Sequence, residues 1–183
     1  MEEQVQRYFA DLESTDKETQ YQAYKNILTL AEKEVDWAYE VWDQLVQDLT
    51  DRDHHKRSRA VQFLSYLAIS DPEKRMLTDF PAIWGVTRDP KFVTARHSLQ
   101  SIWRVGLAGD EQLGLVMSHF ATRFNDCVEE KNYTLIRYDM IQGLRNLYDE
   151  VKKEDIKQKA LDLITKEEDS KYQKKYASVW KNA

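Results

Sequence analysis

A short pattern of apolar and polar residues recurs along this chain, and its spacing restricts the fold more than any other feature. In Val61–Leu67 the order is apolar, Gln, any, apolar, any, polar, apolar, and Leu99–Val105 and Ile141–Leu147 repeat it. Tyr24–Leu30 fits with Lys in place of Gln. The four copies begin 37, 38 and 42 residues apart, and a degenerate copy at Tyr176 begins 35 residues later. Such a period is typical of stacked helical hairpins, so the pattern predicts a small all-helical solenoid.

Apolar residues at helical spacing predict about ten helices in five antiparallel pairs, joined by connections of two to five residues. Strand-type alternation is hard to find, and Gly (5) and Pro (3) are scarce. The expected helices cover about 2–13, 16–33 and 35–50, then a helix with Val61–Leu67, one with Met76–Trp84, one from Pro90 to Val105, and about 110–128, 132–150, 154–166 and 170–181.

Several helix ends carry start signals. Thr15 and Glu18 have the spacing of a capping box, and Asp53 is placed to cap the following helix. Asp71 can cap the next one, with Pro72 at its first position. Pro81 lies inside that helical pattern, where a proline removes one backbone hydrogen bond and bends the helix.

The succession of an outer helix, a tight Asp-rich turn and an inner helix with apolar columns resembles the HEAT and armadillo-type helical repeats. Arg57 and Arg137 stand four residues before the first apolar column, as is common in that superfamily, and Arg96 stands one place out of register. The third copy also carries a turn with Asp89-Pro90. The resemblance covers nearly the whole chain, 1–183. It implies one all-α domain, a right-handed α-α superhelix whose concave side is lined by the inner helices.

The inner helices then present a candidate binding strip. Because the columns that begin at Val61, Leu64 and Leu67 face the core, positions one and five residues after the first column and two before it point away from the core. These positions hold Arg59, Gln62, Tyr66, His97, Gln100, Arg104, Asp139, Gln142 and Asn146. Side-chain amides in one column can pair with the backbone of an extended peptide. A plain solvated helix face would also be polar at these positions.

Charge argues against a general nucleic-acid binder. The chain has a net charge of −5, and residues 1–50 hold 12 acids and 4 bases, which leaves a surplus of three bases in the remainder. The most basic stretch, Arg52–Arg59, could hold phosphate, although neighbouring acids such as Asp53 favour a solvated turn. We expect nucleic-acid binding to be weak.

A single cysteine, Cys127, cannot form an internal disulfide, and we expect it to be a buried small hydrophobe. The start of the chain shows no apolar run like a signal peptide, and no segment approaches the roughly 20 apolar residues of a membrane span. These features predict a cytoplasmic protein. Among the five tryptophans, Trp42 and Trp84 fit core columns, whereas Trp37 and Trp103 lie off the apolar line. These two are the better candidates for exposed anchors, although we expect them rather to pack against the adjacent repeat.

No motif for catalysis, a metal or a cofactor stands out. None of the four histidines is followed by glutamate, and the chain has no Gly-rich phosphate loop and no Ser-His-Asp order. The leading hypothesis is a non-enzymatic scaffold that binds a protein or peptide along its concave face. The alternative is a nucleic-acid-binding protein similar to the HEAT-like DNA alkylation-repair glycosylases, in which Asp139 is the only strip carboxylate able to take a catalytic part.

Overall fold

The computed structural model describes all residues, 1–183, and it contains ten α-helices and no strand. The helices are α1 (Glu3–Asp11), α2 (Lys17–Ala31), α3 (Ala38–Asp48), α4 (His54–Leu67), α5 (Arg75–Gly85), α6 (Phe92–Ile102), α7 (Asp110–Asp126), α8 (Tyr133–Val151), α9 (Glu154–Ile164) and α10 (Ser170–Val179). Short 3-10 helices follow four of them: η1 (Ala68–Ser70), η2 (Val86–Arg88), η3 (Trp103–Leu107) and η4 (Cys127–Glu129). The predictions of an all-α chain and of ten helices are therefore confirmed.

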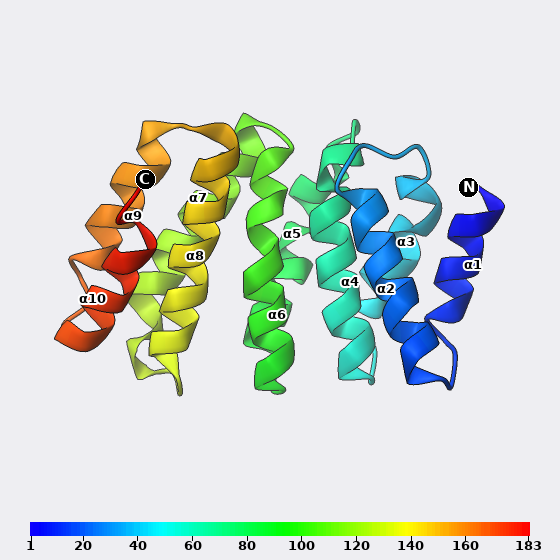
Figure 1. Ribbon diagram of the computed structural model, residues 1–183, viewed down its shortest axis with the longest axis horizontal. Helices are drawn as coiled ribbons and strands as arrows, with labels where there is room; N and C mark the ends of the chain where they lie inside the picture. The colour runs from blue at the N-terminus through cyan, green and yellow to red at the C-terminus, as the bar shows by residue number, and fades with distance from the viewer.

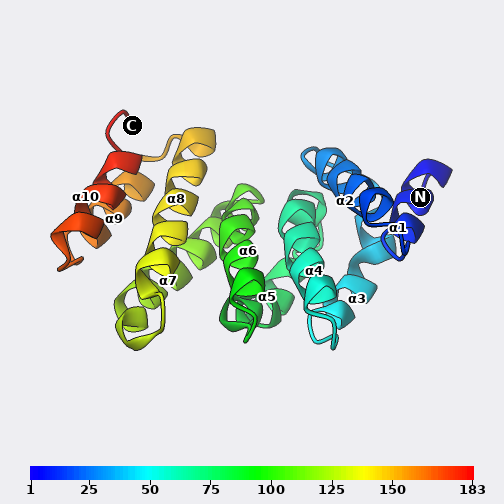
Figure 2. The same cartoon turned by 60° about the horizontal axis from the view of Figure 1, so that its bottom comes forward.

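The helices form two rows along the longest axis of the molecule. Figure 1 shows α2, α4, α6 and α8 side by side in front, with α3, α5 and α7 behind them. Each even-numbered helix contacts the next one, from α2 through to α10. In Figure 2 both ends of the molecule, at α1–α2 and α9–α10, bend toward the side of the even-numbered helices. These helices therefore lie on the inside of the bend.

One apolar core runs through the whole length of the chain. It is a contiguous cluster of 42 buried residues that begins at Val5 and ends at Trp180. Leu64, Ile102 and Leu144, from corresponding positions of the repeated pattern, are all fully buried in it. Full burial of a side chain of this size is worth roughly 1.5–3 kcal/mol, so the repeated columns hold the rows together.

The helix starts agree only in part with the expected signals. Asp53 caps α4 as predicted, since its carboxylate accepts a hydrogen bond from the His55 N–H at 2.8 Å. The Thr15 capping box is wrong, because Asp16 caps α2 by accepting from the Thr19 N–H at 2.9 Å. The helix thus begins one residue later than the capping box predicted, and a carboxylate takes the place of the hydroxyl as its cap.

The start of α5 lies later than predicted. Asp71 does accept hydrogen bonds from backbone N–H groups, those of Arg75 and Met76, at 2.9 and 2.7 Å. Lys74, however, adopts a left-handed conformation with φ of 56°, so the helix cannot begin until Arg75. Pro72 therefore lies in the preceding turn and not at the first helical position. Pro81 is inside α5, as expected.

The aromatic and cysteine predictions have mixed outcomes. Trp42, Trp84 and Cys127 are buried, as predicted. Trp37 is also buried, in an edge-to-face contact with Phe9 at 5.8 Å between ring centroids, so it is not an exposed anchor. None of the ten helices is long and apolar enough to cross a lipid bilayer.

Candidate binding site on the even-numbered helices

The structure gathers the nine strip residues on three neighbouring helices. They are Arg59, Gln62 and Tyr66 on α4, His97, Gln100 and Arg104 on α6 and η3, and Asp139, Gln142 and Asn146 on α8. Because α4 contacts α6 and α6 contacts α8, the helices that carry these residues lie side by side in Figure 1. Whether this strip binds anything remains a prediction at this point.

A pocket of about 430 Å³, here called the Arg59 pocket, opens between α2, α4 and α6. Arg59 and His55 line it from α4, Lys17 and Tyr24 from α2, and His97 from α6. None of the residues that line it is an aspartate or glutamate. The pocket thus combines cationic and aromatic side chains without an acid inside it.

Hydrogen bonds hold the wall of this pocket in place. The Gln62 side-chain carbonyl accepts from the Tyr24 hydroxyl at 2.5 Å, and its amide donates to the Ser58 backbone oxygen at 3.2 Å and to Ser58 Oγ at 3.1 Å. Ser58 Oγ lies 3.3 Å from His97 Nδ1. These contacts tie α2, α4 and α6 together, so the pocket is preformed.

The side-chain amides of the three strip glutamines were expected to be free to bond the backbone of a peptide, but each already makes a hydrogen bond within the chain. Gln62 is used within the pocket wall, Gln100 donates to Asp139 at 3.1 Å, and Gln142 donates to Asn146 at 2.9 Å. Each amide keeps part of its hydrogen-bonding capacity, since a side-chain amide offers two donors and two acceptor lone pairs. The three glutamines therefore help to hold neighbouring side chains in position.

Asp139 is the clear exception among the strip residues. It was expected on the solvent side, but it is only 3% exposed. Arg96 reaches across from α6 and donates to both of its carboxylate oxygens at 2.8 Å, and Gln100 adds a third hydrogen bond. The prediction of an exposed Asp139 is therefore wrong, because the long side chain of Arg96 from the neighbouring helix covers it.

Two charged side chains of the Arg59 pocket have no acidic partner. Arg59 and Lys17 form no ion pair and no side-chain hydrogen bond within the chain, in contrast to Lys56, which lies 3.1 Å from Glu13. Burial, together with the nearby Arg96, lowers the pKa of His97, so its ring is largely neutral at pH 7. The permanent charge of the pocket therefore comes from Arg59 and Lys17.

A smaller pocket of about 120 Å³ continues the first along the strip. The two share Tyr24, Gln62 and His97, and the smaller one adds Tyr66 and Arg104. The Arg104 guanidinium lies 3.8 Å from the Tyr66 ring centroid, a cation–π contact that orients it without a carboxylate. The two pockets together make a groove with aromatic walls and unpaired cations.

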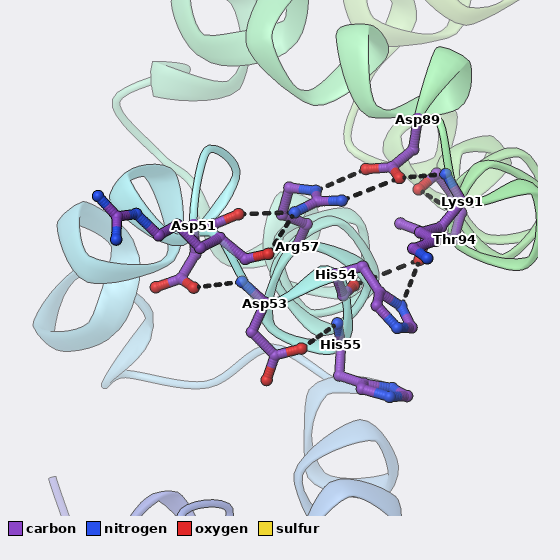
Figure 3. Close-up of polar contacts among 10 residues, drawn as sticks. Asp51, Asp53, His54, His55, Arg57, Asp89, Lys91 and Thr94 are labelled. Atoms are coloured by element: carbon purple, nitrogen blue, oxygen red, sulfur yellow. Dashed lines mark hydrogen bonds and ion pairs between the residues drawn. The ribbon is translucent and has the colours of Figure 1, made fainter.

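The basic stretch Arg52–Arg59 serves mainly as internal structure. Figure 3 shows Arg57 between the backbone carbonyl of Asp51 on one side and the carboxylate of Asp89 on the other. His54 lies beside Thr94, with 3.3 Å between its Nδ1 and the hydroxyl. His54, Lys56 and Arg57 already have partners within the chain, so they do not offer a phosphate site. Arg59 and His55 line the pocket, and their side chains have no hydrogen bond or ion pair within the chain.

The sequence pattern did not predict that side chains of α2 line the pocket. Tyr24 occupies the same position of the repeat as Val61, which led us to expect it in the core. It is only half buried, because a tyrosine reaches past the core boundary and turns its hydroxyl to Gln62. Lys17 and Tyr21 lie outside the repeated segment and gave no signal of their own.

A second depression lies apart from the strip. With about 630 Å³, it opens between the turn before α6 and the start of α8, where Arg88 and Lys131 are exposed. Its two acids are already paired, Asp89 with Arg57 and Glu130 with Arg123. Nowhere in the chain do three or more His, Cys, Asp or Glu side chains come together in a way that could hold a metal ion.

Comparisons with known proteins show the fold alone. No protein-family model matches the chain, and no curated protein sequence is similar to it. Two crystal structures of engineered proteins, both targets of the Northeast Structural Genomics Consortium, are similar over 97% of this chain at 17% identity, with TM-scores of 0.55 and 0.53. The chain spans 47% of the first of these engineered proteins and 78% of the second. They support the helical architecture and carry no information on function.

Proposed function

We propose that this chain is a HEAT-like solenoid that acts as a non-enzymatic scaffold and binds an extended segment of a protein partner along its even-numbered helices. In this proposal the ten helices are five antiparallel pairs in a right-handed superhelix, forming one domain over 1–183. The single observation that carries the proposal is the preformed groove of the Arg59 pocket and its smaller continuation, which has aromatic walls and cations without partners.

Recurring ion pairs support the repeat architecture. Arg57 of α4 reaches Asp89 in the turn that precedes α6, at 2.6 Å, and Arg137 of α8 reaches Glu167 in the turn that precedes α10, at 2.9 Å. Both arginines stand four residues before the first apolar column of their copy. The same sequence position therefore makes the same kind of link to the next pair of helices, as expected for stacked units.

A peptide is favoured over a folded globular surface because the groove is small, about 430 and 120 Å³ in its two parts, and hydrogen bonds hold its wall. Extended segments gain affinity when side chains enter preformed pockets and polar groups meet the backbone. Tyr66 and Trp103 offer half-buried aromatic surface beside the smaller pocket, and Asn146 continues the polar line on α8. We place this function in the cytoplasm, in keeping with the single, buried Cys127.

The alternative of a DNA glycosylase-like protein loses support from the surroundings of Asp139. A catalytic carboxylate must be reachable by the substrate, and this one is buried beneath Arg96 with three hydrogen bonds to its oxygens. Non-specific DNA binders also need many phosphate contacts, whereas this groove offers three cations without a carboxylate partner, Lys17, Arg59 and Arg104.

The test of the proposal compares two faces of the molecule. A partner is captured with the immobilised chain, and its affinity is measured for strip variants, Arg59→Ala and Asn146→Ala, and for outer-row variants, Gln44→Ala and Thr122→Ala. We expect the strip variants to weaken binding about tenfold each and the outer-row variants to leave it unchanged, with all four melting near the wild type. Equal affinities for the two sets would show that the partner uses another surface.

A further inference from the structure

Among the pockets described above, only the Arg59 pocket, which is open to solvent, joins two unpaired cations without any acid in its lining. Arg59 and Lys17 come from different helices, and neither has a carboxylate partner among the twelve ion pairs of the chain. The mutual repulsion of Arg59 and Lys17 is relieved when an anion enters between them.

Two helices begin at the rim of the pocket, and a carboxylate already caps each start, Asp16 for α2 and Asp53 for α4. Lys17 is the first residue of α2, and His55 is the second residue of α4. Lys17 gains nothing from its position, because the start of a helix already carries partial positive charge. The charge that meets an anion in this space of about 430 Å³ is therefore that of Arg59 and Lys17.

We propose that the Arg59 pocket binds a phosphate monoester carried by a side chain of the partner peptide. This inference rests on the proposed function and names the chemistry of its partner. A phosphate monoester carries a charge of about −1.5 to −2 at pH 7 and three acceptor oxygens. That charge matches the two permanent cations, and the oxygens match the donors of an arginine fork and a lysine ammonium. A single carboxylate would neutralise only one of them.

A phosphopeptide fits the charge pattern better than a nucleic acid does. Beyond the pocket, Arg104 lies against the Tyr66 ring and Arg96 is neutralised by Asp139, so two further arginines do not make a regular row of free cations. The first 50 residues, which form α1 to α3, hold 12 acids and 4 bases. This acidic end repels a polyanion that runs past the pocket, while a single phosphate stays within reach of Arg59 and Lys17.

The hydrogen-bonded wall explains how the pocket can be selective. Ser58 and Gln62 fix His97 and Tyr24 in position, so the cavity does not need to reorganise when a phosphate binds. Tyr21, which is 53% exposed at the rim, stacks against Tyr24 with 6.3 Å between centroids. It offers an aromatic surface for the peptide residue next to the phosphate.

The experiment is a titration of the isotope-labelled full chain, followed by backbone amide signals. The probes are inorganic phosphate, then one neutral peptide with a central serine, aspartate or phosphoserine, and a DNA duplex. We expect the change in amide signals to saturate with inorganic phosphate, with a dissociation constant of about 1 mM. The signals that move should belong to the starts of α2 and α4 and to His97. The phosphoserine peptide should bind at least about tenfold more tightly than the serine and aspartate peptides.

The test variant is a double variant that carries both Lys17→Ala and Arg59→Ala. The control is Arg52→Ala, because Arg52 is exposed in the same basic stretch but does not line the pocket. The double variant should lose the tenfold preference, and the control should keep it. A phosphate response that does not saturate, or one equal in wild type and double variant, would overturn the proposal. So would an aspartate peptide as tight as the phosphopeptide, or a duplex that binds more tightly than either.

Failure of this inference is distinguishable from failure of the proposed function. If the phosphate preference is missing while partner affinity still falls in Asn146→Ala, the scaffold function stands and only the phosphate site is wrong. If Asn146→Ala and Arg59→Ala both leave partner affinity unchanged, the proposed function itself fails.

Discussion

Several arginines pair with a carboxylate 30 or more residues further along the chain and so link separate helices. Arg137 is the most buried of the paired arginines on the even-numbered helices, since the side chains of the Arg137–Glu167 pair are 5% and 1% exposed. Arg137 also donates to the Phe124 backbone oxygen at 3.0 Å, and its guanidinium lies 4.3 Å from the Phe124 ring centroid. One side chain therefore joins α7, α8 and the turn before α10.

Removal of this arginine should be costly. Arg137→Ala leaves the Glu167 carboxylate buried without a partner, and we expect it to lower the free energy of unfolding by about 3–5 kcal/mol. Arg7→Ala is the control, because the Arg7–Asp11 contact lies at the surface and should be worth no more than about 0.5 kcal/mol. Urea denaturation of both variants gives the measurement, and similar losses would contradict this role for Arg137.

The Arg57–Asp89 pair predicts a dependence of stability on pH. Burial by itself raises the pKa of Asp89, but hydrogen bonds from Arg57 and from the Lys91 N–H outweigh it and hold the pKa below the ordinary 3.8. A lowered pKa in the folded state means that the stabilisation is complete above pH 4 and is lost as the pH falls through the lowered value. Asp89→Asn should therefore cost about 1.5–3 kcal/mol at pH 6 and clearly less at pH 3. An equal cost at both values would show that the charge of Asp89 is not involved.

The sequence pattern located these arginines but not their partners. Arg57 and Arg137 stand out because each lies four residues before an apolar column. Asp89 and Glu167 lie 32 and 30 residues further along the chain, and no local rule connects residues at that distance. For the same reason Asp139 was expected at the surface, since its cover, Arg96, comes from another helix.

At the scale of the helices, periodicity is reliable and helix ends are less so. All ten helices were predicted because their apolar residues recur every three or four positions. Their ends shift by a few residues where the chain chooses between several hydrogen-bond acceptors, as with Thr15 and Asp16, or leaves helical geometry at Lys74.

Two helical glycines offer a matched test of helix packing. A Cβ at Gly143 of α8 would lie 2.9 Å from Phe120 Cε2 and 3.4 Å from Trp103 Cβ, whereas a Cβ at Gly114 of α7 would meet nothing within 4 Å. Alanine normally stabilises a helix interior by about 0.5–1 kcal/mol over glycine, and Gly114→Ala should show that gain. Gly143→Ala should instead destabilise the protein by about 1–3 kcal/mol, because the Phe120 ring is fully buried and has no room to move.

Thermal unfolding of the two alanine variants checks this difference in sign. A gain in melting temperature for Gly143→Ala would mean that α7 and α8 pack less closely than described. A loss for Gly114→Ala would mean that its surroundings are not open.

At the scale of the whole molecule, two rows of helices present one long face with a groove at one part of it. The sequence predicted the strip but not the pocket, because a pocket depends on how far neighbouring helices stand apart and on which side chains from α2 reach into the space. Tyr24 shows this most clearly. Its position in the repeated pattern predicted a core residue, whereas its hydroxyl donates to Gln62 in the pocket wall. The binding role of the strip remains a proposal.

The most direct test asks which face the partner touches. A photoreactive amino acid is placed at Tyr66, beside the groove, or at the exposed Thr122 on α7 in the outer row, and each version is irradiated with the partner bound. We predict a cross-link to the partner from Tyr66, lost when an excess of unlabelled wild-type chain competes, and none from Thr122. A cross-link from Thr122 with none from Tyr66 would contradict the claim that the even-numbered helices form the binding face.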